Sequence, residues 1–227
     1  MIKEFSKKIG IEFKNLDLLE EALTHRSYLN ENKNIKKRHN ERLEFLGDAV
    51  LELVVTDFLF HNYKNAEGDL TSWRAALVNG ATLAEVSGGL NVGNYLLMSK
   101  GESMDTGRAR QYLLANAMEA IIGAIYLDQG YDVVKDFILK NIVVKIDEIL
   151  EKKLYLDPKS YFQEKAQQFE KITPSYKLIR EEGPDHDRIF TVGVYLENKL
   201  IAKGKGPSKQ VAQRNAAQAG LEIKGWE

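Results

Sequence analysis

The strongest constraint on how this chain folds is a set of acidic residues inside an otherwise apolar stretch, residues 39–51. Glu41, Glu44 and Asp48 are spaced by three and then four positions, which places them within about 60° of one another on a helix. Crowded carboxylates are costly unless positive charge lies among them. A hard divalent cation such as Mg²⁺ meets that need, because it takes oxygen ligands. The pattern predicts a long amphipathic helix over residues 41–63 with a metal site on one face.

A second pair of oxygen-bearing side chains lies in a stretch that is apolar nearly all round, residues 111–127. Asn116 and Glu119 are three positions apart and therefore share a helix face. If this helix packs against the first, both residues converge with Glu44 and Asp48. Cations held by such a group activate water and stabilise charge on a phosphoryl oxygen, and Mn²⁺ could replace Mg²⁺.

An alternative interpretation of the acidic residues is a solvated helix face with ordinary ion pairs, such as Glu41 with Arg42 or Lys37. Spacing alone does not decide between the two interpretations. The chain has no cysteine, which excludes disulfides, thiolate metal sites and a cysteine nucleophile. Its four histidines are scattered without the spacing of metal ligands.

Charge and hydropathy restrict the setting in which the chain works. No apolar run approaches the roughly 18 residues of a membrane span, and residues 1–8 lack the apolar core of a signal peptide. We therefore expect a cytoplasmic protein without membrane contact. Residues 1–157 carry 20 Lys and Arg against 24 Asp and Glu, whereas residues 158–227 carry 12 against 9. This asymmetry hints at a polyanionic partner for the second part, although chance variation in surface charge would explain it equally well.

The first part of the chain shows helical periodicity almost throughout, and polar loops are expected at residues 30–38 and 101–107. An all-α fold is therefore predicted for residues 1–150. The expected helices cover residues 16–23, 41–63, 69–78, 82–90, 111–127 and 131–150.

The pattern changes after a short charged connector, residues 151–157. Residues 158–227 read as helix, three strands and helix, which is a small α+β module in the order α-β-β-β-α. The expected helices cover residues 160–169 and a segment starting near residue 208, and the expected strands cover residues 175–182, 188–196 and 200–203.

Four motifs together resemble the ribonuclease III family. The first is Asn-Glu-Arg-Leu-Glu-Phe-Leu-Gly-Asp-Ala-Val-Leu at residues 40–51, and the second is Thr-His-Arg-Ser-Tyr at residues 24–28. The third combines the two neighbouring segments 67–70 and 74–79, and the fourth is the stretch 119–128. The second part resembles a double-stranded RNA-binding domain. The resemblance covers essentially the whole chain in the family's order, and it is closest to the bacterial form with one catalytic and one binding domain.

The resemblance implies an all-helical endonuclease domain that forms a homodimer and cuts both strands of double-stranded RNA. The products would carry 5′-phosphate and 3′-hydroxyl ends with short 3′ overhangs. Processing of ribosomal RNA precursors and messenger RNA would be the expected role.

The resemblance also implies roles for individual residues of the acidic helices. Glu44 and Glu119 would bind metal, and Asp48 would act with Glu119 as the catalytic pair, orienting water. Glu41 would shape a catalytic valley at the dimer interface. Phe45 would be an apolar knob that enters the partner protomer.

One position departs from the family pattern, because Asn116 stands where the family usually has aspartate. An amide offers one carbonyl oxygen and no charge, so we expect weaker metal binding. A working natural variant, a substitution that traps an inactive form, and a degenerate member that does not cleave are three explanations. The last of these leaves a second hypothesis open, a catalytically weak or inactive dimer that only binds double-stranded RNA.

In the second part, three regions suit an RNA duplex, and the resemblance assigns the same regions to RNA contact. Gln163, Glu164 and Gln167 lie along one side of a helix and suit the shallow minor groove. The turn at 183–186, with His186, could reach a second minor groove. An ordinary solvated helix face is the alternative for the two glutamines.

The third region is the start of the last helix. Lys209 beside Ser208 combines helix N–H groups, the helix dipole and a positive charge for a phosphate, and Lys205 could assist. The aromatic and β-branched residues Phe190, Val192 and Val194 are better explained as core than as a base-stacking platform.

Overall fold

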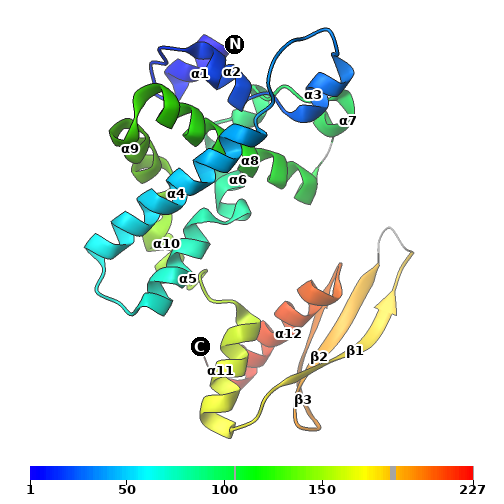
Figure 1. Ribbon diagram of the computed structural model, residues 1–227. Helices are drawn as coiled ribbons and strands as arrows, with labels where there is room; N and C mark the ends of the chain where they lie inside the picture. Colours follow the sequence, from blue (N-terminus) through cyan, green and yellow to red (C-terminus); the bar gives the residue numbers. More distant parts are fainter. Residues whose placement is uncertain (105, 185–187, 227) are drawn as a thin grey trace. The chain divides into compact units, whose positions relative to one another are not determined.

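The computed structural model describes residues 1–104, 106–184 and 188–226 of the chain (Figure 1). The chain divides into two compact units, Met1–Tyr155 and Leu156–Glu227. The first unit is helical and the second combines helices with an antiparallel sheet, which confirms the predicted fold class.

The helical unit is built around two long helices, α4 (Glu41–Asn62) and α8 (Gly107–Gln129). The remaining elements surround this pair, and short 3₁₀ turns connect some of them. They are α1 (Ile2–Lys8), α2 (Leu16–Ala22), α3 (Arg26–Glu31), α5 (Glu67–Val78), α6 (Gly80–Gly89), η1 (Val92–Asn94), α7 (Lys100–Ser103), α9 (Tyr131–Asn141), η2 (Val143–Lys145) and α10 (Ile146–Glu151).

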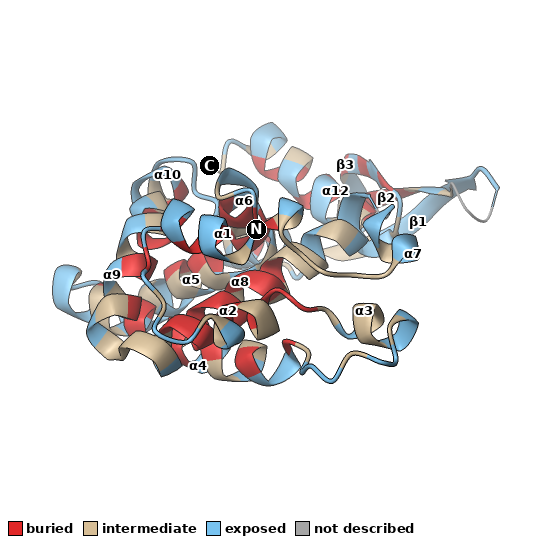
Figure 2. Cartoon of the chain, turned by 90° about the horizontal axis from the view of Figure 1, so that it is seen from above, coloured by how far each residue is buried: buried red, intermediate tan, exposed pale blue. Residues whose placement is uncertain are grey.

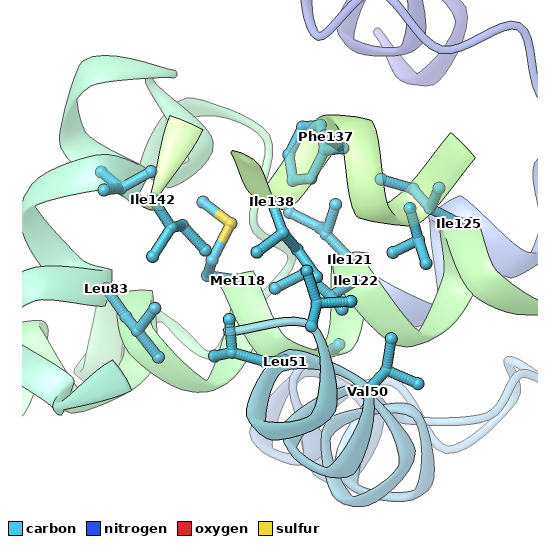
Figure 3. Close-up of a cluster of buried hydrophobic side chains, with 14 of the residues drawn as sticks. Val50, Leu51, Leu83, Met118, Ile121, Ile122, Ile125, Phe137, Ile138 and Ile142 are labelled. Atoms are coloured by element: carbon cyan, nitrogen blue, oxygen red, sulfur yellow. The ribbon is translucent and has the colours of Figure 1, made fainter. Parts of the chain in front are cut away.

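The core of this unit lies along α8, whose middle part is buried on nearly every side (Figure 2). Figure 3 shows the cluster in which side chains of α8 meet those of α4, α6 and α9. Met118, Ile121 and Ile122 are fully buried there, as is Leu51 of α4. The prediction of a central buried helix is therefore confirmed. A helix with apolar residues on nearly every face is stable only when other elements pack around it.

The helices α1 and α3 were not predicted, and α3 reaches into the loop expected at residues 30–38. Two further segments of the helical unit also differ from the sequence prediction. Residues 131–150 do not form one helix, since α9 ends at Asn141 and the turn η2 intervenes. Ile142 and Val143, at the point where the helix is interrupted, are both buried. The predicted loop at 101–107 contains most of the short helix α7. Ser99 caps the start of this helix by accepting a hydrogen bond from the Glu102 N–H.

The helical unit extends past the end of α10. Tyr155 packs its ring against that of Trp73 in α5, with 6.0 Å between ring centroids. Part of the charged segment after Glu151 therefore lies against the helices.

The second unit has two helices and a sheet with strand order β1-β2-β3 among the described residues. Its elements are α11 (Pro158–Glu170), β1 (Ser175–Glu182), β2 (Ile189–Leu196), β3 (Lys199–Gly206) and α12 (Lys209–Lys224). Asp157 caps α11 by accepting from the Ser160 N–H, and Pro158 occupies the first turn, where a missing N–H costs little.

The helices α11 and α12 cover one face of this sheet (Figure 1). Phe162, Val194 and Leu221 form the core between them. The strand β3 is longer than predicted because Gly204 and Gly206 let it lie directly against α12. A Cβ on Gly204 would come within 2.1 Å of the Ala216 backbone nitrogen.

Among the described residues, no helix has the length and apolar character needed to cross a membrane.

Candidate active site and RNA-binding surface

The helices α4 and α8 cross with their backbones in contact at a pair of glycines. A Cβ on Gly47 would lie 1.7 Å from the Glu119 carbonyl oxygen, and a Cβ on Gly123 would lie 2.3 Å from that of Leu43. Only glycine at both positions permits this approach. The crossing brings the first turns of α4 against the middle of α8.

Glu44 and Asp48 flank Gly47 on α4, so the crossing brings them to Glu119 on α8. Burial, followed by the charges of Asp48 and Glu44, raises the pKa of Glu119 to about 7. Burial, followed by the charges of Glu41 and Asp48, also raises the pKa of Glu44. The acidic residues on the two helices therefore repel one another across a partly desolvated site.

Asn116 lies one helical turn before Glu119 on α8. The side chains of Asn116, Glu44 and Glu119 are half-buried, whereas Asp48 is exposed. In the described part of the chain, no three His, Cys, Asp or Glu side chains already stand at metal-binding distances. The donor chemistry nevertheless fits a hard cation, because the site offers oxygen atoms and carries repulsion that a cation would relieve.

Glu41 is exposed at the start of α4 and has an arginine and a histidine as neighbours outside the cluster. Its carboxylate lies 3.7 Å from a guanidinium nitrogen of Arg26 and 3.8 Å from Nδ1 of His39. It nevertheless contributes to raising the pKa of Glu44. Glu41 thus lies at the edge of the cluster, with access to solvent.

An exposed apolar stripe runs along α4 beside these acids. Phe45 is 82% exposed, Leu53 is 56% exposed and Phe60 is 71% exposed. Their spacing places all three within about 80° on the helix. Exposed large apolar residues that share one face indicate an interaction surface.

A pocket of about 430 Å³ lies where this stripe reaches α5, and sequence reasoning did not find it. Leu70 and Arg74 of α5 line it together with Phe60. Arg74 is held by Glu52, with 3.0 Å between Nε and Oε2. Its residues come from two helices and the connector between them, so no local sequence signal marks the pocket.

The motif at 24–28 links the start of the unit to the segment that precedes α8. His25 Nδ1 lies 2.6 Å from Oε2 of Glu102, and the Ser27 hydroxyl donates to the same carboxylate. The Ser99 N–H donates to that hydroxyl at 2.9 Å. These contacts give the motif a structural role. They join residues that are more than 70 positions apart in the sequence, so hydrophobic periodicity could not have predicted them.

In the second unit, Gln163, Glu164 and Gln167 are exposed on α11. They line a shallow hollow of about 560 Å³ together with Ser160, Gln168 and Lys171. The structure thus presents this side of α11 as an open polar surface.

The remaining predicted RNA-contact residues lie around the start of α12. Ser208 caps the helix by accepting from the Val211 N–H, and Lys209 Nζ lies 5.9 Å from the Phe190 ring centroid. Lys205 follows Gly204 and precedes Gly206, which both face α12, so its side chain points to the opposite side of the sheet. His186 lies outside the described residues.

Comparison with known proteins agrees with this architecture. A family model described as ribonuclease-III-like matches residues 15–146, and a double-stranded RNA binding motif matches residues 158–224. Ribonuclease 3 of Clostridium perfringens is 45% identical over 228 residues, covering 99% of this chain and 95% of the relative. The chain belongs to the ribonuclease III family.

Other members of the ribonuclease III family also match this chain. Ribonuclease 3 of Borreliella afzelii is 41% identical and covers 97% of this chain and 90% of its own. A crystal structure of the ribonuclease III nuclease domain from Campylobacter jejuni is 44% identical, with a TM-score of 0.56, covering 65% of this chain and 94% of that domain. This protein is accordingly an endoribonuclease of the ribonuclease III type with a double-stranded RNA-binding domain.

Proposed function

We propose that this protein is a Mg²⁺-dependent homodimer that cleaves double-stranded RNA to leave 5′-phosphate and 3′-hydroxyl ends with short 3′ overhangs. Ribosomal RNA precursors and messenger RNAs in the cytoplasm are the proposed substrates. The observation that carries the proposal is the glycine crossing, which brings Glu44 and Asp48 to Glu119. Burial at this crossing, followed by the charges of Asp48 and Glu44, raises the pKa of Glu119 to about 7.

Within this proposal, Glu44, Asp48, Asn116 and Glu119 hold the metal, and Mn²⁺ can replace Mg²⁺. The bound cation supplies positive charge to phosphoryl oxygens and acidity to water. Asp48 is the exposed member of the set and therefore has access to orient the attacking water. Asp48 and Glu119 act as the catalytic residues.

The homodimer is proposed to form through the apolar stripe on α4. Phe45 enters the partner protomer, and Glu41 shapes the valley between the two acidic clusters. The exposure of Phe45, Leu53 and Phe60 on one face supports this arrangement. A related structure, the nuclease domain from C. jejuni with 45% identity, is described as having a region involved in dimer formation.

Duplex binding is assigned to three regions of the second unit. Gln163, Glu164 and Gln167 would contact one minor groove, and the turn with His186 a second. Lys209 with Ser208 would hold a phosphate at the start of α12. Lys205 would assist from the edge strand β3, although its side chain leaves the strand on the other face of the sheet.

The proposal is tested by incubating the full chain with a long RNA duplex and Mg²⁺, with Glu119→Ala as the matched variant. We expect short duplex products with 5′-phosphate ends from the wild type and none from the variant. Both proteins should shift the duplex equally in a binding assay without divalent metal, because the RNA-contact residues lie on other elements.

Two results would contradict the proposal. One is a wild type that shifts the duplex but leaves it uncut at any Mg²⁺ or Mn²⁺ concentration, which would favour the binding-only dimer. The other is undiminished cleavage by Glu119→Ala, which would remove the acidic cluster from the chemistry.

A further inference from the structure

The sheet of the second unit has a face that neither helix covers. Gly193 lies in the middle of β2 on this face, since its neighbours Val192 and Val194 are buried against the helices. A Cβ on Gly193 would lie 2.7 Å from Leu200, 2.8 Å from Tyr195 and 2.9 Å from Ile179. The tips of these three side chains therefore meet above the glycine and form an apolar centre.

Two lysines flank this apolar centre. Lys177 of β1 and Lys203 of β3 are both paired directly with Gly193, so they point to the same side of the sheet. Adjacent strands are 4.7–4.9 Å apart, so the two backbones lie about 10 Å from each other. Both side chains are exposed, and Lys177 Nζ lies 5.1 Å from the Tyr195 ring centroid.

These cations are free of acidic partners. In the described part of the chain, no carboxylate lies within 4.0 Å of Lys177 or Lys203. The next row on the same face adds Lys205, which is paired with Thr191. Basic side chains thus continue from the apolar centre toward Lys209 at the start of α12, where a duplex phosphate is proposed to bind.

We propose that this outer face, defined by Lys177, Ile179, Tyr195, Leu200 and Lys203, binds single-stranded RNA that flanks the duplex. The inference rests on the proposed duplex binding by the opposite, helical side of the unit. An anionic backbone matches the unpaired lysines, and continuity through Lys205 lets one RNA reach both surfaces.

The apolar centre selects a single strand over a second duplex. A duplex touches proteins with phosphates and groove edges, so it would gain nothing from Ile179 and Leu200, which are 41% and 38% exposed. Unpaired bases expose their faces and can stack on the Tyr195 ring beside Lys177. Basic side chains around an aromatic ring are the usual combination for single-strand binding.

The test compares a blunt RNA duplex with the same duplex carrying an unpaired tail of about ten nucleotides. Binding of both RNAs to the full chain is measured without divalent metal. The wild type should bind the tailed duplex about tenfold more tightly than the blunt one, because stacking of one base is worth about 1–3 kcal/mol.

The double variant Lys177→Gln/Lys203→Gln should lose most of this gain and bind the blunt duplex as the wild type does. Its salt slope with the tailed duplex should fall by about 1.4, since each single-strand phosphate contact contributes about 0.7. Tyr195→Leu should also reduce the gain while retaining an apolar cover for Gly193. Lys140→Gln/Lys199→Gln removes the same charge elsewhere and should behave as the wild type.

Three outcomes would overturn the inference: no gain from the tail in the wild type, a gain that survives the Lys177/Lys203 double variant, or an equal loss in the control. Binding of the blunt duplex reports on the proposed function, and the added effect of the tail reports on the outer face. The two proposals can therefore fail independently.

Discussion

At the scale of single residues, Asn116 sets the charge of the acidic cluster. It lies one turn from Glu119, whose pKa is already raised by burial and by Asp48 and Glu44. An aspartate there would add a fourth carboxylate and more repulsion, which a bound cation would offset. Within the proposed function, the amide would lower the repulsion in the metal-free site and weaken the attraction for metal.

Asn116→Asp is therefore expected to lower the half-saturating Mg²⁺ concentration for cleavage by about three- to tenfold, since ligand charge sets the affinity of such sites. The measurement is the initial rate of duplex cleavage against Mg²⁺ concentration for both proteins. Asn116→Ala serves as the control and should raise the concentration needed. An unchanged half-saturating concentration in Asn116→Asp would show that this position does not influence the metal.

Tyr176 is a second residue whose surroundings make a specific prediction. Its hydroxyl is buried and has no hydrogen-bond partner among the described residues. Burial, with a smaller effect of Asp157, raises the pKa of Tyr176 to about 12 from a usual 10. The folded state therefore keeps the proton more strongly than the unfolded state does.

The free energy of unfolding should consequently fall as the pH rises from about 10 to about 12, because the unfolded chain ionises first. Tyr176→Phe should be at least as stable as the wild type at neutral pH, since it removes an unpaired buried hydroxyl. It should also lose less stability in the alkaline range. Urea unfolding on both sides of pH 10 checks both points, and equal pH dependence of the two proteins would contradict the assigned cause.

At the scale of elements, the contact between α4 and α8 is the feature on which both the core and the acidic cluster depend. The crossing requires direct backbone contact, because a Cβ on Gly47 would overlap the Glu119 carbonyl. The same crossing sets the distance between the acids on the two helices. Stability and the proposed chemistry would therefore be coupled at this position.

Gly47→Ala should lower the free energy of unfolding by about 3 kcal/mol, because the added methyl forces two packed backbones apart. It should also abolish cleavage, because the acids separate with the helices. Thermal unfolding and duplex cleavage are the two measurements. Gly88→Ala is the control, since a Cβ there would meet no described atom within 4 Å outside its own stretch of helix. It should be neutral or stabilising by about 0.4–1 kcal/mol.

At the scale of the whole molecule, the apolar stripe on α4 would determine the oligomeric state. Phe45 contributes little to the fold of one protomer, since 82% of it is exposed. Phe45 lies between Glu44 and Asp48 in the sequence, so dimerisation through Phe45 would place the interface next to the proposed active site. A dimer interface at this place would bring two acidic clusters near one duplex.

Phe45→Glu should convert the proposed dimer to a monomer without loss of helical content, because a buried charge would be placed in the interface. Sedimentation measures the mass and circular dichroism measures the helical content. Val144→Glu changes a residue that is 64% exposed away from the stripe and should leave the dimer intact. A variant Phe45→Glu that sediments as the wild type does would exclude this face as the interface.

Local sequence patterns determined which elements form and what chemistry they carry. Apolar periodicity predicted α4 and the buried helix α8, and the spacing of Glu41, Glu44 and Asp48 predicted one acidic face. These features depend on neighbours within one or two turns, so they can be read from residues close together in the chain. Apolar periodicity did not predict the short helix α7, which Ser99 caps, or the break after Asn141, where Ile142 and Val143 are buried.

Only the tertiary structure decided which distant residues meet. The approach of Glu119 to Asp48 depends on two glycines that touch across helices, and no periodicity encodes that contact. The outer sheet face likewise depends on strand register, which shifts between Leu178 and Arg180 and again between Val194 and Tyr195. Such irregularities are settled by packing against α12 and by pairing across strands, which are long-range contacts of the folded chain.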